Sequence, residues 1–187
     1  MNEITIINES NYKCTNWSGG TTTELVIFPK NASFSDRKFD LRLSIATVEV
    51  ETSTFTPLPQ IKRTLLVLEG DLVLNHLNHY SKSLSPLEQD SFNGGWTTQS
   101  SGKVKDFNLM TSENFESELI VHQLENDESI EIKTFKEINL IYIIEGAINI
   151  DNLQANKHQT INFKRFDKLK SVGKSTIVLI SANKIKD

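Results

Sequence analysis

The chain has 187 residues, 37% hydrophobic and 24% charged, a composition typical of soluble globular proteins that excludes a disordered or fibrous chain. Its net charge of −4 supplies no concentrated basic surface, so no nucleic-acid partner is expected. No segment approaches the roughly twenty apolar residues that span a bilayer, and the first residues lack a secretory pattern, so no membrane partner is expected. A single cysteine, Cys14, cannot form an internal disulfide, and we predict a cytoplasmic location.

Short apolar or alternating runs follow one another along the chain, and helical periodicity does not extend over a dozen residues. Turns rich in glycine, proline or asparagine separate these runs. The pattern therefore predicts an all-β protein. The predicted strands are Leu25–Phe28, Phe39–Val50, Thr64–Leu68, Asp71–Leu74, Val104–Met110, Glu118–Leu124, Leu140–Ile144, Ala147–Ile150, Thr160–Phe163 and Thr176–Ile180.

Two of these regions repeat one motif. Leu65–Leu74 reads LLVLEGDLVL and Ile141–Ile150 reads IYIIEGAINI, and each is an apolar strand, Glu-Gly and a second apolar strand. The glycine supplies the positive φ that a tight hairpin needs, so a hairpin is predicted at each site. Because the flanking strands also match, we expect two copies of one β module, residues 1–112 and 113–187, with N-terminal strands that can cross between them.

A strand, Glu-Gly, strand core in a module of about eighty residues resembles the cupins, which are small antiparallel barrels. Many catalytic cupins hold a metal through two histidines one residue apart. The four histidines of this chain, His76, His79, His122 and His158, contain no such pair. We therefore expect no metal and no other cofactor, and we interpret His76 and His79 as exposed loop residues.

Three stretches together indicate a narrower family. Trp17–Leu25 reads WSGGTTTEL, Phe39–Gly70 reads FDLRLSIATVEVETSTFTPLPQIKRTLLVLEG, and DSFNGG at Asp90–Gly95 is followed by DFNLM at Asp106–Met110. In this order and spacing they resemble the HutD/Ves family of bacterial bicupins. The resemblance implies two antiparallel cupin-type β-barrels packed into one compact chain.

The resemblance also implies a function. It suggests a cytoplasmic bacterial protein connected with histidine utilisation that binds a small carboxylated metabolite, with urocanate or a formylglutamate-like acid as candidates, in a regulatory or sequestering role. Relatives usually carry a longer glycine run and an arginine just before the glutamate, whereas here Ser18 precedes two glycines and Thr23 precedes Glu24. If that arginine binds a ligand carboxylate in relatives, this chain is expected to recognise something else.

Alternation along two predicted strands sorts their polar residues. Arg42 and Ser44 share one face of the strand that starts at Phe39, and Asp106 and Asn108 share one face of the strand Val104–Met110. If these faces converge, they form a set of donors and acceptors suited to a small acid, because a guanidinium can donate two parallel hydrogen bonds to a carboxylate. Glu24 is expected to pair with Arg42, since a buried charge requires a partner.

The remaining candidate ligand contacts have separate reasons. Arg63 is a second candidate anion contact, and the flat side chains of Trp17 and Phe92 could either wall a pocket or pack in the core. The segment Thr15–Pro29 matches no phosphate-loop pattern, which leaves a turn before a strand or the lip of a pocket. Its further candidate contacts are Gly19, Gly20 and Thr23.

Two alternatives to a binding protein remain. One is a metal-independent isomerase or hydrolase that uses Glu24 or Asp106 as acid or base. The other is an assembly module whose sheets form a homodimer. The sequence contains no nucleophile-elbow motif, so a binding protein without catalysis is the favoured interpretation.

Overall fold

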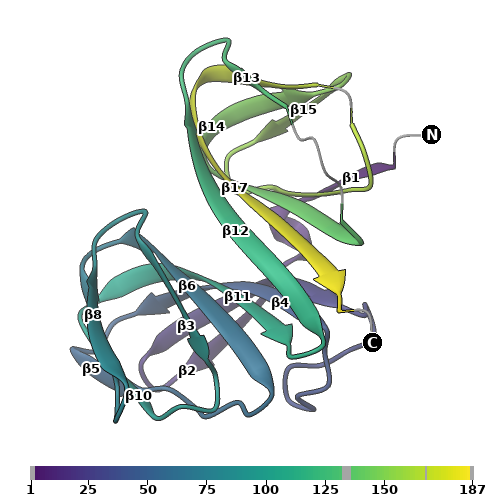
Figure 1. Cartoon of the computed structure of the whole chain (residues 1–187). Coiled ribbons are helices and arrows are strands. Elements are labelled where there is room, and N and C mark those ends of the chain that lie inside the picture. Colours follow the sequence, from purple (N-terminus) through teal and green to yellow (C-terminus); the bar gives the residue numbers. More distant parts are fainter. Residues whose placement is uncertain (1–2, 132–135, 167, 186–187) are drawn as a thin grey trace. The chain divides into compact units, whose positions relative to one another are not determined.

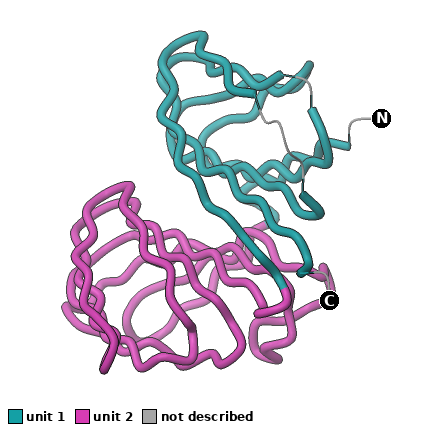
Figure 2. The backbone as a smooth tube through the Cα atoms, in the orientation of Figure 1, with its two compact units in different colours: residues 1–11, 115–187 teal, residues 12–114 magenta. Residues whose placement is uncertain are grey.

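The structure, a computed structural model, describes residues 3–131, 136–166 and 168–185. Apart from one 3-10 turn, η1 (Glu9–Asn11), the regular elements in these ranges are β-strands, which confirms the predicted all-β class (Figure 1). The chain divides into two compact units, residues 1–11 with 115–187 (unit 1) and residues 12–114 (unit 2), coloured in Figure 2. The first strand of the chain thus belongs to the same unit as the last strand.

Unit 2 contains two antiparallel sheets. The six-stranded sheet has the order β2-β3-β4-β11-β6-β9, and the four-stranded sheet has the order β5-β10-β7-β8. The strands of this unit are β2 (Lys13–Trp17), β3 (Gly20–Phe28), β4 (Leu41–Val48), β5 (Thr52–Thr54), β6 (Ile61–Glu69), β7 (Leu72–His76), β8 (Tyr80–Leu84), β9 (Gln89–Asn93), β10 (Thr98–Ser101) and β11 (Val104–Ser112).

Unit 1 contains one seven-stranded sheet. Five strands follow the order β1-β16-β14-β17-β12, β13 pairs with β17, and β15 pairs with β14. The strands are β1 (Ile4–Ile7), β12 (Phe115–Leu124), β13 (Ser129–Ile130), β14 (Ile138–Ile150), β15 (Leu153–Asn156), β16 (Thr160–Phe163) and β17 (Leu169–Lys184).

The two units repeat one strand order. In unit 2 the neighbours run β4-β11-β6-β9, and in unit 1 they run β12-β17-β14-β16. In each unit the last strand along the chain thus lies between an earlier strand and the strand that contains the glutamate of the Glu-Gly motif. Over the described ranges the hydrogen-bonded strands form separate sheets and do not close into the two barrels predicted from the sequence. A β-sandwich built from a repeated module describes the architecture.

The two Glu-Gly sites are not hairpins, contrary to the sequence-based prediction. At Gly70 the chain passes from β6 in one sheet to β7 in the other, and at Gly146 the strand β14 continues through a shift in its register with β17. Both glycines have positive φ, 83° and 78°. A Cβ at Gly70 would lie 2.5 Å from the carbonyl oxygen of Lys103, and one at Gly146 would lie 2.3 Å from that of Lys174. At both sites glycine therefore lets the chain bend where its backbone passes close to the backbone of a neighbouring segment.

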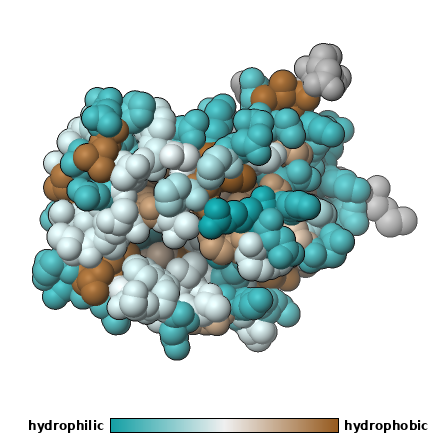
Figure 3. Space-filling view, turned by 90° about the horizontal axis from the view of Figure 1, so that it is seen from below, coloured by the Kyte–Doolittle hydropathy of each residue, from teal (hydrophilic) through white to brown (hydrophobic). Residues whose placement is uncertain are grey.

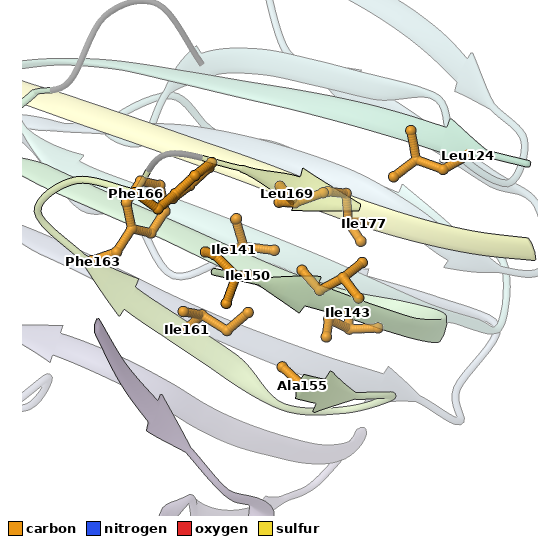
Figure 4. Packing of buried hydrophobic residues seen from close by; sticks show 11 residues of the cluster. Leu124, Ile141, Ile143, Ile150, Ala155, Ile161, Phe163, Phe166, Leu169 and Ile177 are labelled. Carbon is orange, nitrogen blue, oxygen red and sulfur yellow. The ribbon is translucent and has the colours of Figure 1, made fainter. Parts of the chain in front are cut away.

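The interiors of the units differ in chemistry. A cluster of aliphatic and aromatic side chains in unit 1 includes Ile141, Ile150, Ile161 and Phe163, drawn in Figure 4 with carbon atoms meeting carbon atoms. The cluster is fully buried or nearly so, as expected for alternating strands that share an apolar face. Unit 2 has an apolar cluster of its own, but part of its interior is lined by charged and amide side chains, and these define the candidate site.

Candidate functional site

A cavity of about 810 Å³ lies within unit 2. Its wall comes from both sheets and from the loops that join them, and it combines polar and apolar side chains, as small-molecule sites do. Seven of the ligand contacts predicted from the sequence line it, namely Trp17, Gly19, Arg42, Ser44, Arg63, Asp106 and Asn108.

Strand register places the polar side chains in rows on one face of the six-stranded sheet. Arg42 of β4 pairs with Met110 of β11, which pairs with Arg63 of β6. The next row on this face joins Ser44 with Asn108. Asp106 lies two residues before Asn108 on β11, on the same face. Because neighbouring strands lie about 4.8 Å apart, the Cα atoms of the two arginines are about 10 Å apart on one face.

Arg42 is paired with a carboxylate. Its Nε donates a hydrogen bond to Oε2 of Glu24 at 2.7 Å, and its Nη1 donates one to Oγ of Ser44 at 3.1 Å. Glu24 of β3 lies directly opposite Ser44 of β4, so its side chain is on the face of the sheet that carries Arg42. The ring of Phe34 covers the guanidinium, with 4.2 Å from Cζ to the ring centroid. The predicted Glu24–Arg42 pair is present.

Arg63 is buried, and no carboxylate among the described residues contacts it directly. Its Nη2 donates to Oδ1 of Asn108 at 3.1 Å, while its Nε is buried and has no hydrogen-bond partner within the part of the chain that the structure describes. Phe55 lies 4.5 Å from Cζ and Phe92 lies 5.4 Å from it. Burial, together with the positive charge of Arg42, lowers the pKa of Arg63 to about 10, so the guanidinium stays charged at neutral pH. Arg63 is also among the residues that line the cavity.

The side-chain amide of Asn108 forms hydrogen bonds with both Asp106 and Arg63. Nδ2 of Asn108 donates to Oδ1 of Asp106, while Oδ1 of Asn108 accepts from the arginine. Burial raises the pKa of Asp106 to about 7, against the opposing effects of the Arg63 charge and the Asn108 hydrogen bond. Near neutral pH this carboxyl group therefore exists both with and without its proton.

Four predicted ligand contacts are not among the residues that line the cavity. Glu24 acts on the site through Arg42, and Phe92 packs in the apolar cluster beneath Arg63. Thr23 alternates with the cavity-lining Thr22, so its side chain lies on the other face of β3. At Gly20 a Cβ would lie 1.9 Å from the carbonyl oxygen of Thr47, so this glycine permits close approach of β3 and β4.

The two interpretations left open for Thr15–Pro29 both describe this segment. Trp17 of β2 pairs with Gly20 of β3, so Ser18 and Gly19 form the turn of a β-hairpin. The same turn lines the cavity, and the Trp17 ring lies against Gly19, where a Cβ would come within 2.1 Å of ring atom Cζ3. The segment is a hairpin turn and the lip of a pocket at once.

A model of the HutD family matches residues 9–185, nearly the whole chain. The chain belongs to the HutD family. This confirms the family predicted from the sequence, and the match extends over both units. The comparison with curated protein sequences finds no match.

Solved structures similar to this HutD-family chain share its fold. A conserved protein of unknown function from Pseudomonas aeruginosa PAO1 has a TM-score of 0.82 at 19% identity, covering 97% of this chain and 99% of that one. HutD from Pseudomonas fluorescens SBW25 has a TM-score of 0.78 at 19% identity over 98% and 100% of the two chains. A bacterial pirin from Escherichia coli, in complex with nickel(II), has a TM-score of 0.71 at 12% identity over 95% and 98%.

Two aromatic residues of the site were not predicted from the sequence. Phe34 and Phe55 line the cavity and cover the two guanidinium groups, but both follow polar runs without strand alternation. The available signal was a phenylalanine within a serine-rich or threonine-rich loop, where an apolar ring has no obvious core to enter. Such a ring next to an arginine is a cation–π candidate.

His76 is buried on β7, so its interpretation as an exposed loop residue is wrong. Its Nε2 lies 2.9 Å from Oδ2 of Asp90 and its Nδ1 lies 2.8 Å from Oγ1 of Thr98. Asp90 also accepts hydrogen bonds from Tyr80 and Lys82, which makes burial of its charge tolerable. Alternation of β7 puts His76 on the same face as Leu72 and Leu74, which explains its burial. His79 is exposed, as expected, and stacks on Trp96.

His76 contacts the candidate site indirectly, through the ring of Phe92. The imidazole of His76 lies 4.4 Å from the ring of Phe92, and Phe92 lies beneath the Arg63 guanidinium. Among residues 3–131, 136–166 and 168–185, no group of three or more His, Cys, Asp or Glu side chains is arranged to hold a metal ion. The polar side chains that line the cavity are those of arginine, aspartate, asparagine, serine and threonine.

The exposed apolar residues of this HutD-family chain are scattered. They include Trp17, Phe34, Ile120, Leu153 and Val172. On the face drawn in Figure 3, brown apolar residues form separate spots among paler and teal ones instead of a continuous patch. Two of these residues, Trp17 and Phe34, belong to the cavity wall. The part of the chain that the structure describes contains no helix long and apolar enough to cross a membrane.

Proposed function

We propose that unit 2 of this HutD-family protein binds a small carboxylated metabolite and acts in regulation or sequestration. One observation carries the proposal: the charged guanidinium of Arg63 belongs to a residue that lines the cavity, and among the described residues its side-chain partner is the amide of Asn108 and not a carboxylate. A carboxylate is the acceptor that best fits a planar guanidinium edge, because two parallel charge-assisted hydrogen bonds can form there. The remaining lining residues supply positions for the body of such a ligand.

The cavity favours an acid with a flat or apolar body. Trp17, Phe34, Phe55, Leu58 and Met110 contribute apolar wall surface around the arginines. A ligand body can pack against these side chains while its carboxylate meets a guanidinium, which is how most small-molecule sites combine affinity with orientation. Urocanate, one of the two candidates implied by the family resemblance, has a flat body of this kind, whereas a formylglutamate-like acid, the other candidate, has a flexible polar body. Either acid would connect the protein with histidine utilisation.

A catalytic alternative is favoured by one observation. Asp106 lines the cavity and has a pKa of about 7 caused by burial, which suits a general acid or base at neutral pH. Glu24, the other candidate, is engaged by Arg42 and lies outside the cavity lining, so Asp106 is the residue to test. Incubation of the protein with urocanate, followed by chromatography, should leave the acid unchanged if binding is the whole function.

The binding proposal is tested by calorimetric titration with urocanate and formylglutamate. Arg63→Gln removes the charge, and Lys62→Gln is the matched control because Lys62 is the exposed neighbour on the same strand. We expect about 30- to 100-fold weaker binding for Arg63→Gln, equivalent to about 2 to 3 kcal/mol, and unchanged binding for Lys62→Gln. The proposal is wrong if neither acid binds at millimolar concentration, or if Arg63→Gln binds as tightly as the control.

A further inference from the structure

The charged groups of the cavity can be counted. Arg42, Arg63 and Asp106 line it, and Glu24 neutralises Arg42 through a 2.7 Å ion pair. Among the described residues that line the cavity, Arg63 then remains as the one cation that no carboxylate contacts directly, because Asn108 connects it to Asp106. With Asp106 ionised, the four groups sum to zero, and with Asp106 protonated they sum to +1.

A bound anion and the Asp106 carboxylate would therefore compete for one positive charge. Both would be buried near Arg63, where two negative charges facing one cation are costly. Protonation of Asp106 would remove one of the two negative charges when the ligand binds. Because burial raises the pKa of Asp106 to about 7, this protonation requires little free energy near neutral pH. The protonated carboxyl group also gains an O–H donor for the ligand.

The other charged groups around Asp106 do not alter this balance. Arg42 on β4 is matched by Glu24 on β3, and Arg63 on β6 is the charge under consideration. On β9, Asp90 is engaged by three donors, from His76 of β7 and from Tyr80 and Lys82 of β8, and it is not among the cavity-lining residues. The titrating carboxyl group of the cavity is thus Asp106.

From this arrangement we infer that the site selects small monocarboxylates over dicarboxylates, and that each carboxylate bound above neutral pH brings one proton into the site on Asp106. This inference rests on the proposed carboxylate-binding function. It also separates the two candidate acids, because urocanate carries one carboxylate and a formylglutamate-like acid carries two. A second carboxylate would need a second unmatched cation. The described lining contains a single unmatched cation, Arg63.

The test uses a matched pair of flat acids, trans-cinnamate and 4-carboxycinnamate, whose carboxyl groups stay ionised from pH 6.5 to 8.5. Titration calorimetry at pH 8.5 in two buffers of different ionisation enthalpy measures the number of protons taken up on binding. We expect close to one proton per cinnamate, and roughly 10- to 30-fold weaker binding at pH 8.5 than at pH 6.5. The dicarboxylate should bind at least tenfold more weakly than cinnamate at either pH.

Asp106→Asn should abolish both the proton uptake and the pH dependence, whereas Glu69→Gln, a change at an exposed carboxylate of β6, should alter neither. Binding of cinnamate without proton uptake, or equal affinity for the two acids, would overturn the inference while leaving carboxylate binding intact. If neither these acids nor urocanate and formylglutamate bind, the proposed function itself is wrong and the inference goes with it. The proton count for the unmodified protein decides the matter even if Asp106→Asn does not fold.

Discussion

At the scale of single residues, the unusual feature is a buried carboxyl group held by an amide instead of a cation. Asp106 is 3% exposed, and Asn108 connects it to Arg63. A direct ion pair with Arg63 would favour the charged carboxylate and oppose the rise in the pKa of Asp106. The bridging amide thus leaves a carboxyl group that titrates near neutral pH beside an arginine that no carboxylate of the described residues contacts.

The raised pKa of Asp106 has a consequence for stability. Its folded-state pKa of about 7 lies above the ordinary value of 3.8, so the folded protein holds this proton more tightly than the unfolded chain does. The contribution to stability is fully present below about pH 4 and is lost as pH rises through about 7. Asp106→Asn removes this loss, so its unfolding free energy relative to the unmodified protein should rise by roughly 2 to 3 kcal/mol between pH 5 and pH 8.

Urea denaturation at pH 5, 6, 7 and 8 measures this difference. Glu69→Gln serves as the control, since its carboxylate is exposed, and its curve should run parallel to that of the unmodified protein. A constant difference between Asp106→Asn and the unmodified protein across this range would show that Asp106 has an ordinary pKa.

At the scale of elements, the repeated Glu-Gly motif shapes both units by bending strands. In each copy the glycine has a positive φ and lies over a main-chain carbonyl oxygen of the neighbouring strand region. Alternating apolar residues on either side keep the chain extended, so the bend leads to a different partner or register instead of a hairpin. The cavity of unit 2 depends on the bend at Gly70. There the chain leaves the six-stranded sheet at the end of β6, and β7 joins the four-stranded sheet.

Gly146→Ala should destabilise the protein far more than Gly173→Ala. Both glycines have similar positive φ, 78° and 73°, but a Cβ at Gly146 would meet the Lys174 carbonyl oxygen at 2.3 Å, whereas a Cβ at Gly173 meets nothing within 4 Å. We expect about 1 kcal/mol lost for Gly173→Ala from backbone conformation alone, and about 3 kcal/mol or more for Gly146→Ala. Chemical denaturation measures both, and equal losses would show that close strand approach contributes nothing at the bend.

At the scale of the whole molecule, the chain begins in one unit, builds the other and then returns. β1 pairs with β16 residue by residue from Ile4 with Phe163 to Ile7 with Thr160. Ile4 and Ile6 pack against the apolar cluster of unit 1, although unit 2 follows them directly in sequence. The residues that line the cavity all belong to residues 12–114.

Charge placed on the two faces of β1 should therefore act differently. Ile6→Asp introduces a carboxylate at the apolar cluster and should cost about 1 to 3 kcal/mol of unfolding free energy, while Thr5→Asp, on the exposed face, should cost under about 0.5 kcal/mol. Both variants should bind the cavity ligand within twofold of the unmodified protein. A loss of affinity in Ile6→Asp comparable to that of Arg63→Gln would show that the state of unit 1 controls the site.

The amino-acid sequence by itself determined the apolar strands, the repeated module, the family, and the common face of Arg42 with Ser44 and of Asp106 with Asn108. These follow from backbone geometry, because successive side chains of a strand point to opposite faces whatever the strand pairs with. Strands such as β2 (Lys13–Trp17), β8 (Tyr80–Leu84) and β10 (Thr98–Ser101) were missed, since their polar residues carry no such alternation.

Only the tertiary structure decided which groups meet. The Asn108 bridge between Arg63 and Asp106, the burial of His76, the cover of Phe34 and Phe55 over the arginines, and the exclusion of Thr23 and Phe92 from the cavity wall all depend on pairing between distant segments. Register and bulges set those pairings, and a shift of one residue would move every side chain to the opposite face. Local pattern predicts a face, but the partners across it are chosen by the packing of the whole unit.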